Sequence, residues 1–296
     1  MPDASFHAKP WNERTGTLVI GRVSHNPQKH YKRLKLIVDF VANRLQDFGI
    51  VQGDVLLAKD NQQLIQFLQE GKVDWVTETS FSALFFEEET GAEIVLRRWK
   101  KGVPNYRSLF FVRKDSGIAS LEDLKGKKIA FSDPGSTTSF LFPSAILKSR
   151  GLELVQLGSL DEQPARDKAG YIFTGGDELN VSTWVYKGLA DAGAFSDQDW
   201  QSRSDTPEVI KKDLRVIYRS EKIPRALELF RKEMPQKIKA KIKEILLNAH
   251  NDPQAKTALQ AYRQTLKFEE IDDTANKQLG EVRRLYKLMR KELNQN

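Results

Sequence analysis

Strand-length apolar segments alternate with longer amphipathic segments near the start of the chain, and this alternation restricts the fold more than any other feature. Residues 18–23 have a strand pattern, and apolar residues recur at helical spacing from Tyr31 to Asp47. The same order repeats, with strands expected at 55–58, 73–76 and 93–96 and helices at 61–69 and 80–89. Strands that alternate with helical crossovers form a mainly parallel sheet flanked by helices, so the sequence predicts an α/β fold.

The alternation starts again at residue 106, which indicates a second and smaller α/β unit. Strands are expected at 106–112, 129–132, 154–157 and 192–195, and helices at 136–147 and 181–187. Residues 214–218 also have a strand pattern, and we expect them to return to the first unit. The rest has the pattern of amphipathic helices, at 223–233, 235–249, 253–262 and 271–292. One large doubly wound domain with a helical tail is the alternative to two units.

The net positive charge of the chain raises the question of a nucleic-acid partner. The chain has 47 basic and 40 acidic residues, a formal net charge of +7. The basic residues are mixed with glutamates along the amphipathic segments, as at Lys241 and Glu244. This mixture is typical of a solvated surface, so the sequence predicts no nucleic-acid partner.

The residues of several common catalytic and metal sites are missing from the sequence. There is no cysteine, and the four histidines (His7, His25, His30 and His250) show no metal-ligand spacing. The chain has no Gly-x-Ser-x-Gly nucleophile elbow, no phosphate loop that ends in Gly-Lys-Ser/Thr, and no Gly-x-Gly-x-x-Gly. We therefore expect a protein that is not an enzyme and that uses no cofactor and no metal. An enzyme with a dispersed active site is the alternative.

The segment from Phe131 to Pro143 contains the most informative local pattern. A strand-like run ends in a Pro-Gly turn, after which Ser136, Thr137 and Thr138 open a helix-like segment. The first backbone N–H groups of a helix have no acceptor within the helix and lie at the positive end of its dipole. The segment is therefore a candidate site for phosphate, phosphonate or sulfonate. The alternative is that Ser136 only caps the helix.

The same segment also carries a family resemblance. Asp-Pro-Gly-Ser-Thr-Thr at 133–138, followed by Leu-Phe-Pro at 141–143, resembles a signature of the phosphate/phosphite/phosphonate-binding proteins of ABC importers. Further stretches resemble the same family, at 71–75, 106–118, 120–127 and 188–194. Together these blocks cover about residues 17–225.

This resemblance implies a two-lobed type II periplasmic-binding-protein fold. Lobe 1 is expected at 1–106 and 217–296, with the C-terminal helices packed on it, and lobe 2 at 107–216. The resemblance also implies a monomeric receptor that holds a small anionic ligand in the cleft between the lobes and presents its closed form to an ABC permease. A periplasmic or extracytoplasmic location is expected, although Met1 to Pro10 contain no export signal. The alternatives are a ligand-sensing domain of a signalling system and an enzyme on the same bilobal fold, similar to pyrimidine synthases.

Further ligand-binding candidates lie where strands end and helices begin. Thr79 and Ser80 follow the strand expected at 73–76, and they are equally suited to cap the next helix. The family resemblance adds Tyr106, because aromatic residues at this place shape the pocket or donate a hydroxyl group. Tyr31, which opens the first long helix, is a similar candidate.

The loop at 175–180 departs from the family pattern, which usually reads Gly-x-His-Asp/Glu. Here Asp177 takes the place of the histidine and Glu178 the place of the acid. A carboxylate repels a doubly charged anion unless it is protonated or paired with a cation. We therefore expect a ligand that also carries an ammonium group, with Asp177, Glu178 or Glu78 as its partner. The alternative is that these are surface acids.

Overall fold

The computed structural model describes residues 16–24 and 26–290. These residues form two compact units: unit 1 contains 16–105 and 224–277, and unit 2 contains 106–223 and 278–290. Residue 106 and residues 217–223 and 278–290, which were predicted to belong to lobe 1, therefore group with unit 2. The N-terminal lead-in up to residue 15 and the end of the last expected helix, beyond residue 290, lie outside the described residues.

Unit 1 is built on a mixed six-stranded sheet with the order β14-β4-β13-β3-β1-β2. Its strands are β1 (Thr17–Val23), β2 (Gln52–Ala58), β3 (Trp75–Glu78), β4 (Glu93–Arg98), β13 (Leu227–Phe230) and β14 (Phe268–Glu270). β1 pairs in parallel with β2 and β3, whereas β13 runs antiparallel to both β3 and β4, and β14 runs antiparallel to β4. The parallel part arises from consecutive strand–helix–strand crossovers, and the later segments of the chain add the antiparallel strands.

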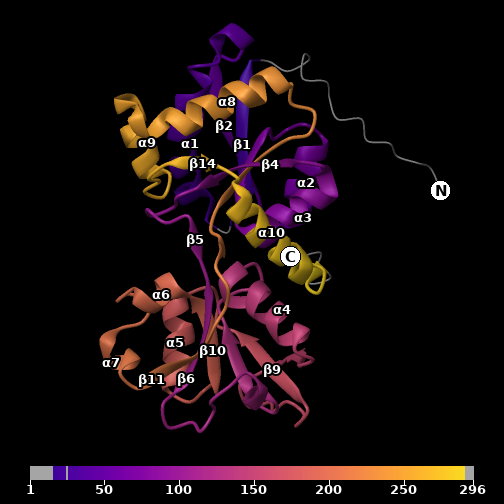
Figure 1. Cartoon of the computed structure of the whole chain (residues 1–296), viewed down its shortest axis with the longest axis vertical. Helices are drawn as coiled ribbons and strands as arrows, with labels where there is room; N and C mark the ends of the chain where they lie inside the picture. Colours follow the sequence, from indigo (N-terminus) through magenta and orange to yellow (C-terminus); the bar gives the residue numbers. More distant parts are fainter. Residues whose placement is uncertain (1–15, 25, 291–296) are drawn as a thin grey trace, which may run out of the picture. The chain divides into compact units, whose positions relative to one another are not determined.

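Helices cover both faces of this sheet (Figure 1). They are α1 (Pro27–Ala42), α2 (Asn61–Gln69), α3 (Ser80–Thr90), α8 (Gln236–Asn248) and α9 (Lys256–Ala261), with short 3-10 turns at Gln46–Phe48, Ala249–Asn251 and Pro253–Ala255. The apolar stripe of α1, which includes Ile37 and Val41, packs in one buried cluster with Ile242 and Leu246 of α8. The helices expected at 61–69 and 80–89 are thus confirmed, and the one expected from Tyr31 begins earlier, at Pro27.

The helix expected at 223–233 is wrong, because this segment contains two strands. β12 (Ile223–Pro224) pairs with β5 (Asn105–Tyr106) in a small separate sheet, and β13 lies between β3 and β4. All four residues of β13 are buried, including Glu228. The apolar residues on both sides of Glu228 match helical spacing. Here, however, Glu228 is buried in the sheet, where side chains distant in the sequence bind its carboxylate.

Unit 2 has a second mixed six-stranded sheet, with the order β11-β6-β10-β7-β9-β8. Its strands are β6 (Ser108–Arg113), β7 (Lys128–Phe131), β8 (Glu153–Gln156), β9 (Lys168–Phe173), β10 (Ala192–Ser196) and β11 (Leu214–Arg219). β7, β8, β9 and β10 are parallel, while β6 is antiparallel to β10 and β11. The expectation that residues 214–218 return to the first unit is wrong, because β11 pairs with β6.

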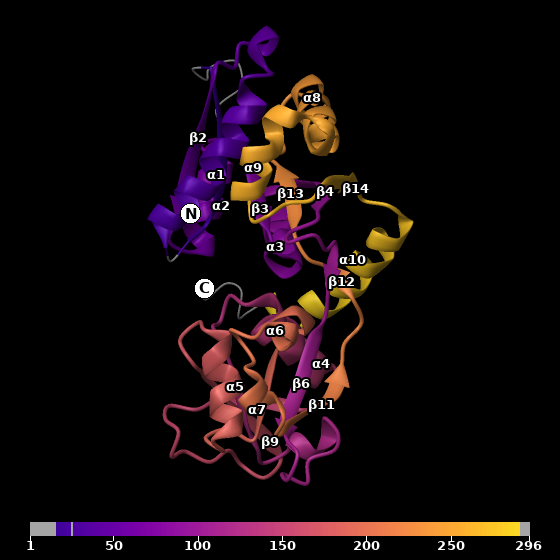
Figure 2. The ribbon, with the colours of Figure 1, turned by 90° about the vertical axis from the view of Figure 1, so that its left-hand side faces the viewer.

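The helices of unit 2 also lie on both faces of its sheet, with α5 and α7 on one side and α4 on the other in both ribbon views (Figures 1 and 2). They are α4 (Phe142–Ser149), preceded by a π-helical turn at Thr137–Leu141, α5 (Glu178–Tyr186), α6 (Asp197–Gln201) and α7 (Glu208–Lys211), with a 3-10 turn at Glu122–Leu124. A further helix, α10 (Asp273–Tyr286), follows β14. The ring centroids of Phe111 and Phe195 lie 4.4 Å apart, with the rings tilted by 37°, in the core beneath α5. Among the described residues, no helix combines the length and apolar character needed to cross a bilayer.

Candidate functional site

The predicted helix start at Ser136 forms directly after β7, at the carboxyl end of the strand. Ser136 is the N-cap residue, and its hydroxyl oxygen accepts the backbone N–H of Ser139 at 3.1 Å. The carbonyl oxygen of Ser136 accepts the N–H groups of Phe140 and Leu141 at 3.0 and 2.9 Å. The N–H groups of Thr137 and Thr138 therefore lie before the first intrahelical hydrogen bond, at the positive end of the helix.

Neighbouring strands hold this helix start in place. The Ser139 hydroxyl donates to the carbonyl oxygen of Ala194 in β10 at 2.6 Å and accepts the N–H of Ser132 at 2.8 Å. The Ser108 hydroxyl of β6 donates to the carbonyl oxygen of Thr138 at 2.9 Å. Sequence reasoning missed Ser108 and Ser139 as positioning residues. The signal for Ser139 was present in the sequence, because this residue continues the run of hydroxyl residues at 136–138. No local pattern identifies Ser108.

The residues of the helix start are shielded from solvent. Thr137 and Thr138 are only 3% and 7% exposed, and Ser136 is half-buried. Amide dipoles act more strongly on a charge when little water surrounds them. The capping and anion-binding interpretations of Ser136 are compatible, because the cap uses the N–H of Ser139 and not those of Thr137 and Thr138.

The two acids of the loop at 175–180 have different surroundings. Asp177 is exposed and caps α5, its Oδ1 accepting the N–H of Leu179 at 3.0 Å. Glu178 is half-buried. Burial first, and then the negative charges of Asp199, Asp133 and Asp205, raise the pKa of Glu178 to about 7. Glu178 is therefore the acid of this loop that can exchange a proton near neutral pH or accept an ammonium partner.

The candidates of unit 1 follow β3. Ser80 is fully buried, and its hydroxyl donates to the carbonyl oxygen of Pro224, so this group is engaged within the unit. Thr79 is the N-cap residue of α3, and its N–H donates to Oε2 of Glu78 at 3.3 Å. The other oxygen of Glu78 lies 3.9 Å from the Arg22 guanidinium at the end of β1.

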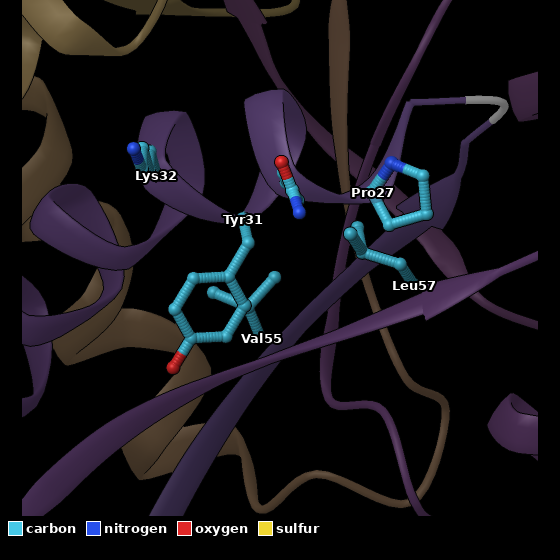
Figure 3. A pocket seen from close by; sticks show the side chains of 6 residues that line it. Pro27, Tyr31, Lys32, Val55 and Leu57 are labelled. Carbon is cyan, nitrogen blue, oxygen red and sulfur yellow. The ribbon is translucent and has the colours of Figure 1, made fainter.

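The two tyrosine candidates occupy separate places. Tyr106 is 5% exposed and belongs to β5. Tyr31 is 40% exposed and lines a pocket of about 640 Å³ between the start of α1 and strand β2. In this pocket the Tyr31 ring lies beside Val55, and Pro27 lies beside Leu57 (Figure 3). Since β2 is an edge strand, this pocket lies at the side of the unit 1 sheet.

No metal site was expected, and within residues 16–24 and 26–290 no three His, Cys, Asp or Glu side chains are placed to hold a metal ion together. His7 and His25 lie outside these described residues.

Two α/β units with mixed six-stranded sheets, joined by crossing segments, define a type II periplasmic-binding-protein fold. Solved structures share this fold. PhnD1 from Prochlorococcus marinus in complex with methylphosphonate matches at a TM-score of 0.65 and 18% identity, covering 94% of this chain and 100% of that chain. The aliphatic sulphonate binding protein from Escherichia coli matches at 0.53 and 15%, covering 94% and 88%.

The chain belongs to the ABC transporter phosphonate periplasmic substrate-binding protein family, whose model matches residues 22–275. This is a family of substrate-binding proteins and not of enzymes. The chain is 26% identical over 215 residues to the phosphonates-binding periplasmic protein of Escherichia coli, and 34% identical over 124 residues to the phosphate-import protein PhnD of Mycolicibacterium smegmatis. These matches cover 71% and 41% of this chain, but they span only 60% and 37% of the two relatives.

A solved relative is similar over almost its whole length. XAC2383 from Xanthomonas citri is 36% identical with a TM-score of 0.87, and the match covers 93–94% of this chain and 99% of that chain. Its structures are described with a bound chloride ion and with bound ATP.

Proposed function

We propose that this protein is the solute receptor of an ABC importer and that it binds a small oxyanion, either a phosphonate or a phosphate. The helix start at Ser136, Thr137 and Thr138 carries this proposal. Its leading amides lie at a strand end, the hydroxyl groups of Ser108 and Ser139 position it, and family membership supplies the receptor role.

The surroundings of Glu178 support a ligand that also carries an ammonium group. The carboxyl groups of Asp133, Asp199 and Asp205 are close enough to Glu178 to interact with it electrostatically. The ammonium group of such a ligand would offset this negative charge, while its phosphonate group would accept hydrogen bonds from the backbone amides of the helix start. The proposed ligand class is therefore an aminoalkylphosphonate.

An organic polyphosphate is the second candidate, because XAC2383 is 36% identical and has a structure bound to ATP. Such a ligand presents the same terminal phosphate chemistry to a helix start, together with a longer anionic chain.

Family membership also supports a proposal for the location and the protein partner. We propose that the protein acts as a monomer outside the cytoplasmic membrane and presents its ligand-bound form to an ABC permease. Closure of two lobes on the ligand also stays a prediction, which small-angle scattering with and without ligand would test.

Calorimetric titration of the full chain tests the ligand class. We expect 2-aminoethylphosphonate to bind more tightly than methylphosphonate and inorganic phosphate. Tighter binding of phosphate would reject the ammonium partner, and no binding of any phosphorus compound would reject the receptor.

A matched pair of variants tests the site. Thr138→Val removes one hydroxyl group at the helix start and keeps the side-chain shape, whereas Thr183→Val makes the same change on α5. We expect Thr138→Val to weaken phosphonate binding by about 10- to 150-fold, since a hydrogen bond to a charged group contributes about 1.5–3 kcal/mol. Equal affinities of the two variants would contradict the proposed site.

A further inference from the structure

Four basic side chains gather at the carboxyl edge of the unit 1 sheet, a place where α/β proteins bind ligands. Arg22 lies near the end of strand β1, His30 and Arg33 are on α1, and Arg263 follows α9. Helices α1 and α9 pack against each other, which brings these segments together (Figure 2). Nη2 of Arg263 lies 3.3 Å from Nε2 of His30, and Nδ1 of His30 lies 2.7 Å from the Ser24 hydroxyl. We call Arg22, His30, Arg33 and Arg263 the cationic cluster.

Acidic residues balance little of this positive charge. Arg22 has one carboxylate nearby, that of Glu78 at 3.9 Å. Among the described residues, neither Arg33 nor Arg263 has a carboxylate within ion-pairing distance, and Nη1 of Arg33 and Nε of Arg263 are buried with no acceptor. Buried guanidinium donors are normally satisfied, so unpaired donors from two segments indicate acceptors that a ligand supplies.

The members of the cluster are close enough to repel one another. Burial first, and then Arg22, Arg263 and Arg33, lower the pKa of His30 to about 3. Burial and the neighbouring arginines likewise lower the pKa of Arg263 to about 10. His30 is therefore neutral near pH 7, so its Nε2 accepts from Arg263 while its Nδ1–H donates to Ser24. A neutral histidine in this place orients Arg263 without adding a further positive charge.

The backbone holds Arg263 in an unusual conformation. Arg263 and Gln264 have φ angles of 58° and 52°, in the left-handed region that residues with a side chain seldom adopt. Lys101, with φ 52°, donates its backbone N–H to the carbonyl oxygen of Arg263 at 3.1 Å. Strained residues of this kind concentrate at ligand-binding sites, where the surrounding structure maintains them.

We propose that the cationic cluster is a second anion-binding site, which receives the phosphate chain of a solute bearing two or more linked phosphate groups. This inference rests on the proposed function, and of its two candidate ligands it favours the polyphosphate over the aminoalkylphosphonate. Planar guanidinium groups bind phosphate oxygens through paired hydrogen bonds, and a chain of phosphates offers enough oxygens to satisfy Arg33 and Arg263 together.

The test is calorimetric titration of the full chain with methylphosphonate, inorganic tripolyphosphate and ATP, at fixed salt concentration. We expect tripolyphosphate to bind at least about 100-fold more tightly than methylphosphonate. Arg33→Gln and Arg263→Gln should each weaken tripolyphosphate binding by about 10- to 100-fold and change methylphosphonate binding by less than about threefold. Arg44→Gln, at the other end of α1 where Arg44 pairs with Asp252, is the charge-matched control and should change neither affinity.

The melting temperature separates a binding role from a structural one. Removal of a repelled cation that has no carboxylate partner should leave the melting temperature of the Arg33→Gln and Arg263→Gln variants unchanged or raise it. ATP that binds like tripolyphosphate, or more tightly, supports the inference, and the difference between the two measures what the nucleoside adds.

Three results would overturn the inference while the proposed function stands. These are tripolyphosphate binding no tighter than methylphosphonate, an equal loss of both affinities in the arginine variants, and a tripolyphosphate preference that survives both substitutions. Failure of every phosphorus compound to bind would instead refute the proposed function.

Discussion

Glu228 occupies the centre of the unit 1 sheet, and its replacement is the most demanding test of how that unit is stabilised. Its carboxylate is fully buried on β13 and accepts hydrogen bonds from four groups. The donors are Nε of Arg98 at 2.7 Å, Nε1 of Trp75 at 2.7 Å, the Tyr262 hydroxyl at 2.9 Å and the Thr77 hydroxyl at 3.1 Å. Burial raises the pKa of Glu228, and Arg98, Trp75 and Tyr262 oppose this rise.

Glu228→Gln keeps the size of the side chain and removes its charge. The variant leaves the buried Arg98 guanidinium without a counter-charge and turns an amide NH2 toward other donors. Removing one partner of a buried ion pair costs about 3–5 kcal/mol in the free energy of unfolding. For a unit of this size, about 2–4 °C of melting temperature corresponds to each kcal/mol, so we expect a decrease of about 6–20 °C.

Thermal and urea unfolding followed by tryptophan fluorescence measure this change, because Trp75 contacts the replaced carboxylate. Glu244→Gln is the matched control: Glu244 is 61% exposed and pairs with Lys241 on the surface of α8, so its loss should cost less than about 1 kcal/mol. The double variant Glu228→Gln/Arg98→Met should recover part of the lost stability. If Glu228→Gln destabilised the protein no more than the control, the reasoning about the buried charge would be refuted.

Three further predictions concern pH, selectivity and the helix cap. The folded-state pKa of His30 is about 3, below its ordinary value of 6.5, so the unfolded chain binds a proton between these values that the folded protein does not. Stability should therefore fall as pH decreases from 6.5 toward 3, by at most about 1.4 kcal/mol per pH unit and less where solvent screens the charges. Urea unfolding of His30→Asn should show a flatter pH dependence, and an unchanged slope would contradict this origin. Glu178→Gln should shift binding from 2-aminoethylphosphonate toward methylphosphonate by about tenfold in calorimetry, because it removes the proposed ammonium partner; unchanged selectivity would contradict that role. Ser136→Ala should lower the free energy of unfolding of unit 2 by about 0.5–2 kcal/mol in urea denaturation, because the N–H of Ser139 loses its cap, whereas no loss would mean that the cap contributes nothing.

Local patterns predicted much of the fold. The helices at α2 and α3 follow from apolar residues at helical spacing, and β1 follows from a short apolar run before a helix. The helix start at Ser136 was also predictable, because a cap, a turn and a strand end depend on residues that are adjacent in the chain. The loop of Asp177 and Glu178 was identified because it departs from the family pattern. Nothing in the sequence predicts that Glu178 is half-buried while Asp177 is exposed.

Features that depend on distant partners were not predictable in this way. The segment of β13 has the apolar spacing of a helix. Its buried Glu228 is compatible with a strand only because Trp75 and Arg98, which are distant in the chain, bind the carboxylate. The pairing of β11 with β6 is likewise decided by contacts across the sheet. The cationic cluster joins residues of β1, α1 and the segment after α9, and no spacing rule connects Arg22 with Arg263.

The most direct test of the account observes the backbone amides at the helix start during ligand binding. Titration of methylphosphonate into the labelled protein, followed by proton–nitrogen NMR, should shift the Thr137 and Thr138 amide signals more than any others in unit 2, with downfield proton shifts typical of hydrogen bonds to an anion. Saturable binding that leaves both signals unchanged would contradict the central claim that these amides hold the ligand.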